Sequence, residues 1–132
     1  MGWEELYQQR LTTADEAVKH IKSGDRVALG NAMGEPHVLC DALVRNKDQY
    51  ENVELVQMIT MGKAEYCMPG MQKHFRYNSL FLGGATRDAA ADCRADVTTC
   101  FFSEIPSLFR SNLVPDVALI QVSTPDKHGY CS

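Results

Sequence analysis

The chain has 132 residues, of which 45% are hydrophobic and 23% are charged, and its formal net charge is −4. These values are typical of one globular domain and exclude the disordered and collagen-like classes. The basic residues are scattered, so we expect no nucleic acid partner. No apolar run is long enough to span a membrane, and the acidic start Met-Gly-Trp-Glu-Glu does not look like a signal peptide, so we expect a cytoplasmic protein.

Five cysteines are present, an odd number with irregular spacing. This pattern indicates reduced thiols rather than the disulfide framework of a small secreted protein. Two pairs are conceivable metal ligands, Cys67 with His74 and Cys93 with Cys100, but neither pair has the tight spacing of a structural zinc site. We therefore predict that the chain holds no metal.

The first predicted elements are a helix, a strand and a second helix. Thr13-Ala-Asp-Glu16 matches a capping box that begins the first helix, and Gly24 lies just past its end. Arg26–Leu29 is an apolar run typical of a buried strand. Pro36 suits the first turn of a helix, where no amide donor is lost. Residues 30–35 must then form the turn between this strand and this helix.

The rest of the chain continues the alternation of strands and short helices. Thr86 and Ser103 are the predicted caps of two short helices. The last strand is a nearly continuous apolar run, typical of a parallel sheet that is covered on both faces. The alternation predicts an α/β domain over residues 1–132, with an open, largely parallel sheet and helices on both faces. The further predicted strands are 53–59, 75–82, 97–102 and 117–122.

Glycines follow the first two strands at the ends where an α/β sheet binds ligands. Gly30 and Gly34 allow close approach of the backbone to a bound group, and Gly62 occupies the turn after the second strand. If the two strands are parallel neighbours, both turns emerge on the same rim of the sheet. The glycine spacing fits neither the Rossmann nor the Walker fingerprint, so no nucleotide is predicted. A plain strand-to-helix connection is the alternative interpretation of the first turn.

Two single residues invite a chemical role, each with a simpler alternative. His128 lies near Cys131 on a loop that we expect on the same rim, and an imidazole can activate a thiol. Proximity in sequence does not establish that geometry, and an ordinary loop histidine and cysteine is the favoured reading. Glu35 follows Gly34 and is a candidate to touch a ligand, or it stabilises the helix N-terminus through the helix dipole.

Five ordered blocks, covering nearly the whole chain, are together similar to the amino-terminal part of the acetyl-CoA hydrolase/transferase family, and within it to 4-hydroxybutyrate CoA-transferases. The resemblance departs at Cys93, where glycine is expected, and at Thr99 and Thr124, where proline is expected. The blocks are Gly30-Asn-Ala-Met-Gly-Glu-Pro36, Met61-Gly-Lys-Ala-Glu-Tyr66, His74-Phe-Arg-Tyr-Asn-Ser-Leu-Phe-Leu-Gly-Gly84, Cys100-Phe-Phe-Ser-Glu-Ile-Pro106, and Asp116-Val-Ala-Leu-Ile-Gln-Val122 with Asp126-Lys-His-Gly-Tyr-Cys-Ser132.

The resemblance implies an enzyme of two domains that exchanges CoA between a short-chain acyl-CoA, such as 4-hydroxybutyryl-CoA, and acetate or a similar carboxylate. In this family a glutamate attacks the thioester and a glutamyl-CoA intermediate follows. That glutamate and a glycine loop that helps bind CoA belong to the second domain, beyond Ser132. We therefore assign no catalytic residue to this chain and expect it to be inactive alone. Coenzyme A is implied as a substrate, and no permanently bound cofactor is expected.

The chain is expected to supply one wall of the substrate cleft, through backbone donors and shape around the acyl group. An exposed sheet edge further predicts a homo-oligomer. Two alternatives stay open, namely an acyl-CoA hydrolase of the same family and a non-catalytic ligand-binding or assembly module. The predicted substrate-binding residues are Gly30, Asn31, Ala32, Met33, Gly34, Glu35, Thr60, Met61, Gly62, His128 and Gly129.

Overall fold

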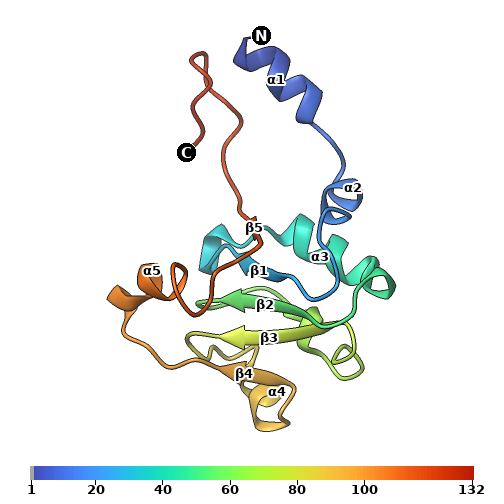
Figure 1. The fold of residues 1–132 in the computed structure, drawn as a ribbon, viewed down its shortest axis with the longest axis vertical. Helices are drawn as coiled ribbons and strands as arrows, with labels where there is room; N and C mark the ends of the chain where they lie inside the picture. The colour runs from blue at the N-terminus through green and yellow to red at the C-terminus, as the bar shows by residue number, and fades with distance from the viewer. Residues whose placement is uncertain (1) are drawn as a thin grey trace.

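The computed structural model describes residues 2–132 and contains one five-stranded sheet, in the order β4-β3-β2-β1-β5 (Figure 1). Every neighbouring pair of strands is parallel, which confirms the predicted α/β architecture. The carboxyl ends of all strands therefore meet along one edge of the sheet. The strands are β1 Arg26–Leu29, β2 Val53–Gln57, β3 Phe75–Ser79, β4 Ala95–Val97 and β5 Val117–Leu119.

The main hydrophobic core lies on the face of the sheet that is covered by α2 (Ala14–Val18), α3 (His37–Arg45) and α4 (Arg87–Ala91). Alternate strand residues such as Leu55 and Tyr77 point into this core, as expected for the two-residue period of a strand. Helix α3 contributes Cys40, Ala42 and Leu43, which are buried against them. This packing fixes the start of α3 next to the carboxyl edge of the sheet.

The other face of the sheet carries both apolar and polar side chains. Nearly continuous apolar strands would have made this face apolar throughout. A small cluster of Val56, Leu80 and Leu113 packs under α5 (Ile105–Leu108), so helices do lie on both faces. Beside it, polar side chains join neighbouring strands. Arg26 Nε donates to Glu54 Oε2 over 2.5 Å, and Asn78 Nδ2 donates to Glu54 Oε1 over 3.0 Å. These cross-strand bonds satisfy polar groups that would otherwise be costly to bury.

The strands predicted at 53–59 and 75–82 end earlier, at Gln57 and Ser79, and the last two strands differ more from the prediction. The fourth was predicted at 97–102 but lies at Ala95–Val97, where it pairs in register with β3. The fifth was predicted over 117–122 but ends at Leu119, because the chain then leaves the sheet. It pairs only with β1, and Ile120 and Val122 are 62% and 52% exposed. The expectation that this strand is covered on both faces is wrong, because Ala118 on one face is exposed while Leu119 on the other is buried.

The helix caps were partly predicted. Thr13 Oγ1 accepts a hydrogen bond from the Glu16 amide, but the Glu16 carboxylate pairs with Lys19, so only half of the capping box forms. Thr86 precedes α4 without capping it, since its hydroxyl is directed to the carbonyl of Gly83. Ser103 does not cap α5 either, because it lies within a 3-10 turn, Phe102–Glu104, and Glu104 is the residue that precedes the helix.

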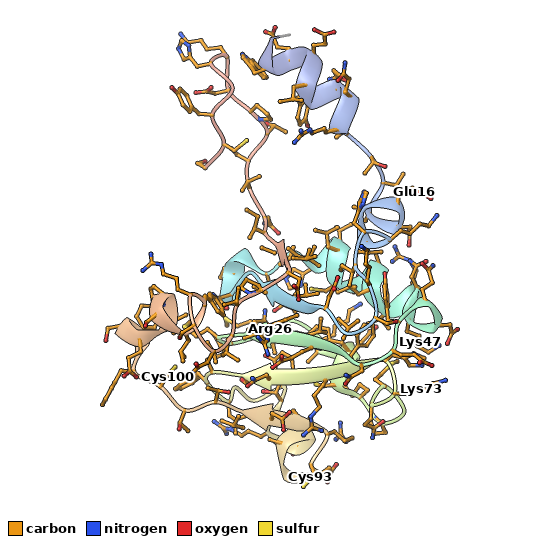
Figure 2. The ribbon with its side chains drawn as sticks, in the orientation of Figure 1. Glu16, Arg26, Lys47, Lys73, Cys93 and Cys100 are labelled. Atoms are coloured by element: carbon orange, nitrogen blue, oxygen red, sulfur yellow. The ribbon has the colours of Figure 1, made fainter. Side chains whose placement is uncertain are left out.

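The two ends of the described chain project from the body of the sheet at different places, one before α2 and one after β5 (Figure 1). Helix α1 (Trp3–Arg10), which was not predicted, buries none of its side chains, and residues 120–132 run beside it (Figure 1). Figure 2 shows that the side chains of both segments project from this arm rather than into the sheet. Within residues 2–132, no helix is both long and apolar enough to cross a bilayer.

Candidate functional site

The turns after β1 and β2 lie side by side at the carboxyl edge of the sheet, as predicted. The Ala32 amide donates to the carbonyl of Ile59 over 3.0 Å, and the Asn31 side chain accepts from the Met58 amide over 2.8 Å. Such bonds continue the pairing of the two strands past their ends. The two turns therefore form one joined surface rather than two independent loops.

The first turn is tightly wound on itself. A 3-10 helix spans Ala32–Gly34, and Ala32 adopts a left-handed backbone with φ of +50°. A Cβ atom at Gly30 would lie 2.4 Å from the carbonyl oxygen of Gly34, so no larger residue fits without moving the turn. The glycine at position 30 is thus required by a close approach within the turn itself.

Glu35 joins the first turn to the second. Its side chain is only 1% exposed, and its Oε2 atom accepts from the Thr60 hydroxyl at 2.6 Å and from the amides of Met61 and Gly62 at 3.2 and 3.3 Å. A buried carboxylate needs such donors to offset the loss of water. A Cβ atom at Gly62 would lie 2.6 Å from Glu35 Oε1, which explains the glycine there. Glu35 therefore links the two turns through these hydrogen bonds, and we call this link the Glu35 clasp. The sequence had suggested either a ligand contact or stabilisation of the helix N-terminus, and neither describes this link.

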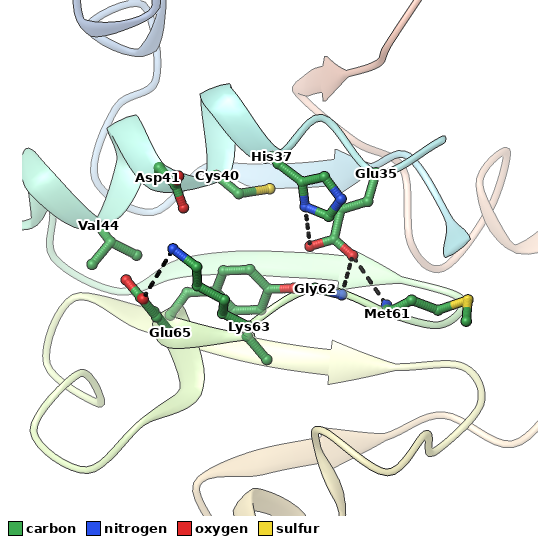
Figure 3. A pocket seen from close by; sticks show the side chains of 11 residues that line it. Glu35, His37, Cys40, Asp41, Val44, Met61, Gly62, Lys63 and Glu65 are labelled. Atoms are coloured by element: carbon green, nitrogen blue, oxygen red, sulfur yellow. Dashed lines mark hydrogen bonds and ion pairs between the residues drawn. The ribbon is translucent and has the colours of Figure 1, made fainter. Parts of the chain in front are cut away.

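A cavity of about 460 Å³ opens beside this clasp, between α3 and the segment that follows Thr60 (Figure 3). His37 Nδ1 lies 3.9 Å from Glu35 Oε1, and Lys63 Nζ lies 3.7 Å from Glu65 Oε1. Three of the predicted residues line the cavity, namely Glu35, Met61 and Gly62. The lining residues that were not predicted are His37, Cys40, Asp41, Val44, Lys63, Ala64, Glu65 and Tyr66.

A signal for part of this lining was present in the sequence. His37, Cys40, Asp41 and Val44 follow the helical spacing of one face, so a helix known to start at the rim would turn these four side chains toward the cavity. The second half of the lining comes from an irregular segment, residues 61–66, whose course no periodicity indicates. That segment was predicted only as far as Gly62.

Two buried side chains that line the cavity, Cys40 and Tyr66, keep their protons at physiological pH. Burial raises the pKa of the Cys40 thiol to about 12, with a further contribution from the charges of Glu35 and Asp41. Burial likewise raises the pKa of the Tyr66 hydroxyl. Because the thiolate is the reactive form of cysteine, Cys40 is not a nucleophile here. The cavity offers shape and hydrogen bonding rather than an activated nucleophile.

Apolar side chains mark the outer surface of the same edge. Met33 in the first turn is 81% exposed and Met61 in the second is 64% exposed. Next to them, an apolar cavity of about 300 Å³ lies among Met58, Ile59, Leu80, Phe81, Cys100, Phe102 and Ile105. Large exposed apolar groups gathered in one place indicate a surface that binds a ligand or another part of a protein.

His128 and Gly129 are not brought to this site. Gly129 has a left-handed backbone, φ +86°, and packs on Trp3, whose ring would be 2.7 Å from an added Cβ atom. The loop is closed instead by Asp126, which accepts from the His128 amide over 2.8 Å. The segment lies beside α1, away from the joined turns (Figure 1). Among residues 2–132, no cluster of three or more His, Cys, Asp or Glu side chains is arranged to hold a metal ion.

Known proteins resemble this chain along its whole length. A family model described as the acetyl-CoA hydrolase/transferase N-terminal domain matches residues 1–132. The 4-hydroxybutyrate coenzyme A transferase of Clostridium kluyveri is 57% identical over 100% of this chain and 31% of its own length. The butyryl-CoA:acetate CoA-transferase of Anaerostipes caccae is 34% identical over 98% of this chain and 30% of its own. The chain thus spans about a third of the length of these relatives.

Solved structures agree with these sequence matches. The 4-hydroxybutyrate CoA-transferase of Porphyromonas gingivalis has a TM-score of 0.76 and 36% identity, over 98% of this chain and 29% of that protein. RipA from Yersinia pestis has a TM-score of 0.89 over 100% of this chain and 33% of that protein, and at 24% identity this likeness concerns the fold alone. Together with the family match, these findings show that the chain belongs to the acetyl-CoA hydrolase/transferase family and carries its N-terminal domain.

Proposed function

We propose that the natural protein containing this chain is a CoA-transferase, and that the chain forms one wall of its substrate cleft. The observation that carries the proposal is the 57% identity to a 4-hydroxybutyrate coenzyme A transferase over the whole chain. The proposed substrates are a short-chain acyl-CoA, such as 4-hydroxybutyryl-CoA, and acetate or a similar carboxylate. The proposed protein has a second domain after this one, since the matched relatives are about three times longer.

The proposed reaction conserves the energy of the thioester. A glutamate carboxylate in the second domain attacks the acyl carbon, which breaks the carbon–sulfur bond and releases the CoA thiolate. The thiolate attacks the glutamyl carbonyl of the resulting anhydride, which releases the first carboxylate and leaves a glutamyl-CoA thioester. The incoming carboxylate then reverses both steps. Water has to be kept away from both intermediates, because their hydrolysis would waste the thioester.

In this scheme the joined turns position the acyl group and help to keep water away from it. The proposed contacts are the predicted substrate-binding residues of both turns, 30–35 and 60–62. Met33 and Met61 project from the two turns and are suited to cover an apolar acyl chain, because both are largely exposed in this chain. The clasp at Glu35 ties together the two turns that carry these side chains. His128 and Gly129 stay a weaker part of the proposal, supported only by the family resemblance.

The proposal also includes a cytoplasmic location and a homo-oligomer. Its support is the composition of the chain and the apolar surface around Ile120 and Val122, which lie just past the edge strand β5 and are more than half exposed. An exposed strand edge with apolar neighbours is a surface that proteins usually cover. CoA enters the scheme as a substrate that is bound and released in each cycle.

An exchange assay on the intact natural protein tests the proposal. With 4-hydroxybutyryl-CoA and acetate, we expect acetyl-CoA to appear in the amount of acyl-CoA that is consumed, without free thiol. Release of free CoA thiol without acetyl-CoA would instead identify the acyl-CoA hydrolase of the same family. No consumption of any short-chain acyl-CoA would contradict both enzymes and favour a binding or assembly module.

A further inference from the structure

A buried polar network lies beneath the joined turns and is not explained by packing. At its centre is Gln57, the last residue of β2, whose side chain is 0% exposed. Its Nε2 atom donates to the carbonyl of Gly30 over 2.6 Å. Its Oε1 atom accepts from the hydroxyls of Tyr66 and Tyr77 over 3.0 and 3.1 Å. A carboxamide in the middle of an apolar core is costly unless its groups are bonded in this way.

The carbonyl of Gly30 fixes the orientation of the Gln57 amide. A carbonyl can only accept, so the amide nitrogen must face Gly30, and the amide oxygen is then left to accept from both tyrosine hydroxyls. The rings of Tyr66 and Tyr77 pack together with their centroids 5.3 Å apart, and both residues are buried. Burial raises the pKa of each hydroxyl, so each remains a protonated donor. Gln57 is therefore held in one orientation by groups that do not titrate near neutral pH.

Gly30 is the residue at which the chain leaves β1 for the candidate site. Its amide donates to the carbonyl of Leu119 over 2.9 Å, and its carbonyl accepts from Gln57, so both of its backbone groups are held. Other bonds either stay within the first turn or, from the Asn31 and Glu35 side chains and the Ala32 amide, reach the second turn rather than the buried core. Gln57 is thus the side chain that connects the joined turns to the core beneath them.

We propose that Gln57 is a positioning residue for CoA transfer, which sets the course of the 30–35 turn through the carbonyl of Gly30. This inference rests on the proposed function, because it assigns the turn a role in binding the acyl group. Gln57 touches no substrate in this scheme. It acts by holding Gly30, and with it Met33 and the Glu35 clasp, where the substrate requires them.

The first test compares variants of the intact natural protein. Gln57→Leu removes all three hydrogen bonds, and Tyr66→Phe removes one of the two donors to the amide oxygen. Tyr50→Phe is the matched control, because the Tyr50 hydroxyl is also buried and donates to the carbonyl of Val18 over 2.9 Å, away from the site. We expect similar losses of melting temperature for the two tyrosine variants. We expect kcat/KM to fall about tenfold or more for Gln57→Leu and to stay within about twofold for Tyr50→Phe.

A second variant separates positioning from simple stability. In Gln57→Glu, the introduced carboxyl is nearly isosteric, and its pKa is raised by burial. When protonated, it donates to the Gly30 carbonyl and accepts from Tyr66, as the amide does. When ionised at higher pH, it can no longer donate, and it repels that carbonyl. We expect kcat/KM of this variant to fall about tenfold between about pH 5 and pH 8 relative to the unaltered protein. A profile parallel to that of the unaltered protein would overturn the inference.

Amide hydrogen exchange distinguishes failure of this inference from failure of the proposed function. We expect the amides of Ala32 and Met58, which join the two turns, to exchange about tenfold faster in Gln57→Leu and at an unchanged rate in Tyr50→Phe. If the unaltered protein transfers no CoA but exchange responds in this way, the proposed function fails while the link from Gln57 to the turn stands. If exchange at these amides is unchanged, the inference is wrong even in an active enzyme.

Discussion

Cys93 occupies a backbone conformation that favours glycine. It lies between α4 and β4 with φ of +57°, a left-handed conformation that few residues other than glycine adopt readily. The Arg94 amide reaches back to the carbonyl of Ala89, and the Cys93 amide to that of Ala90, which is the pattern of a Schellman motif. Glycine is the preferred residue at this position, which explains why the family resemblance leads one to expect it.

Cys93→Gly is therefore expected to stabilise the protein. Relief of the left-handed strain is worth about 1 kcal/mol, partly offset by the greater freedom of glycine in the unfolded chain. Urea unfolding of the variant measures the change in the free energy of unfolding. Cys93→Ala is the matched control, because it removes the thiol but keeps a Cβ atom at the same positive φ. Equal stability of the two variants would show that the strain is negligible.

The element that organises the site is the pair of turns after β1 and β2. The carboxylate of Glu35 links them, and the shortest of its bonds comes from the hydroxyl of Thr60. Thr60 is 3% exposed, so the loss of this donor leaves a buried charge less well compensated. We therefore expect the stability of the Glu35 clasp to depend more on the Thr60 hydroxyl than on the volume of the Thr60 side chain.

Thr60→Val preserves the shape of the side chain and removes its hydroxyl, which donates to Glu35 and also accepts from the Gly62 amide over 3.1 Å. We expect the free energy of unfolding to fall by about 2 kcal/mol, the usual range for a hydrogen bond to a charged group. Thr86→Val is the control, because Thr86 is also buried but its hydroxyl lies 3.5 Å from its acceptor, a long and weak bond. Denaturant unfolding of both variants makes the comparison. A loss for Thr60→Val no larger than that for Thr86→Val would contradict the clasp.

The sequence indicates these elements to different degrees, for physical reasons. Buried strands such as Val53–Gln57 leave a pattern of apolar residues that is visible without a structure, and parallel strand ends must meet at one edge. Strand ends are set by partners distant in sequence, which is why β4 was predicted too late in the chain. The bonds from Glu35 to Thr60 and from Gln57 to Gly30 join residues 25 and 27 positions apart, so no local pattern indicates them.

At the scale of the whole molecule, the carboxyl edge of the sheet is an apolar surface. The large exposed side chains of this edge follow different strands, and among them Phe81 and Phe102 are 62% and 76% exposed. The chain after β5 was expected on the same edge, but it leaves the sheet and runs beside α1, so His128 and Gly129 lie elsewhere (Figure 1). The direction in which a chain leaves an edge strand is set by what packs on it, which a sequence pattern does not reveal.

The central claim is that the joined turns form the wall against which the acyl group of an acyl-CoA lies. A crystal structure of the intact natural protein with a bound short-chain acyl-CoA tests it most directly. We expect the acyl and thioester atoms to lie within about 4 Å of residues in both turns, 30–35 and 60–62. An acyl-CoA bound with neither turn in contact would contradict the account, whatever the activity of the protein.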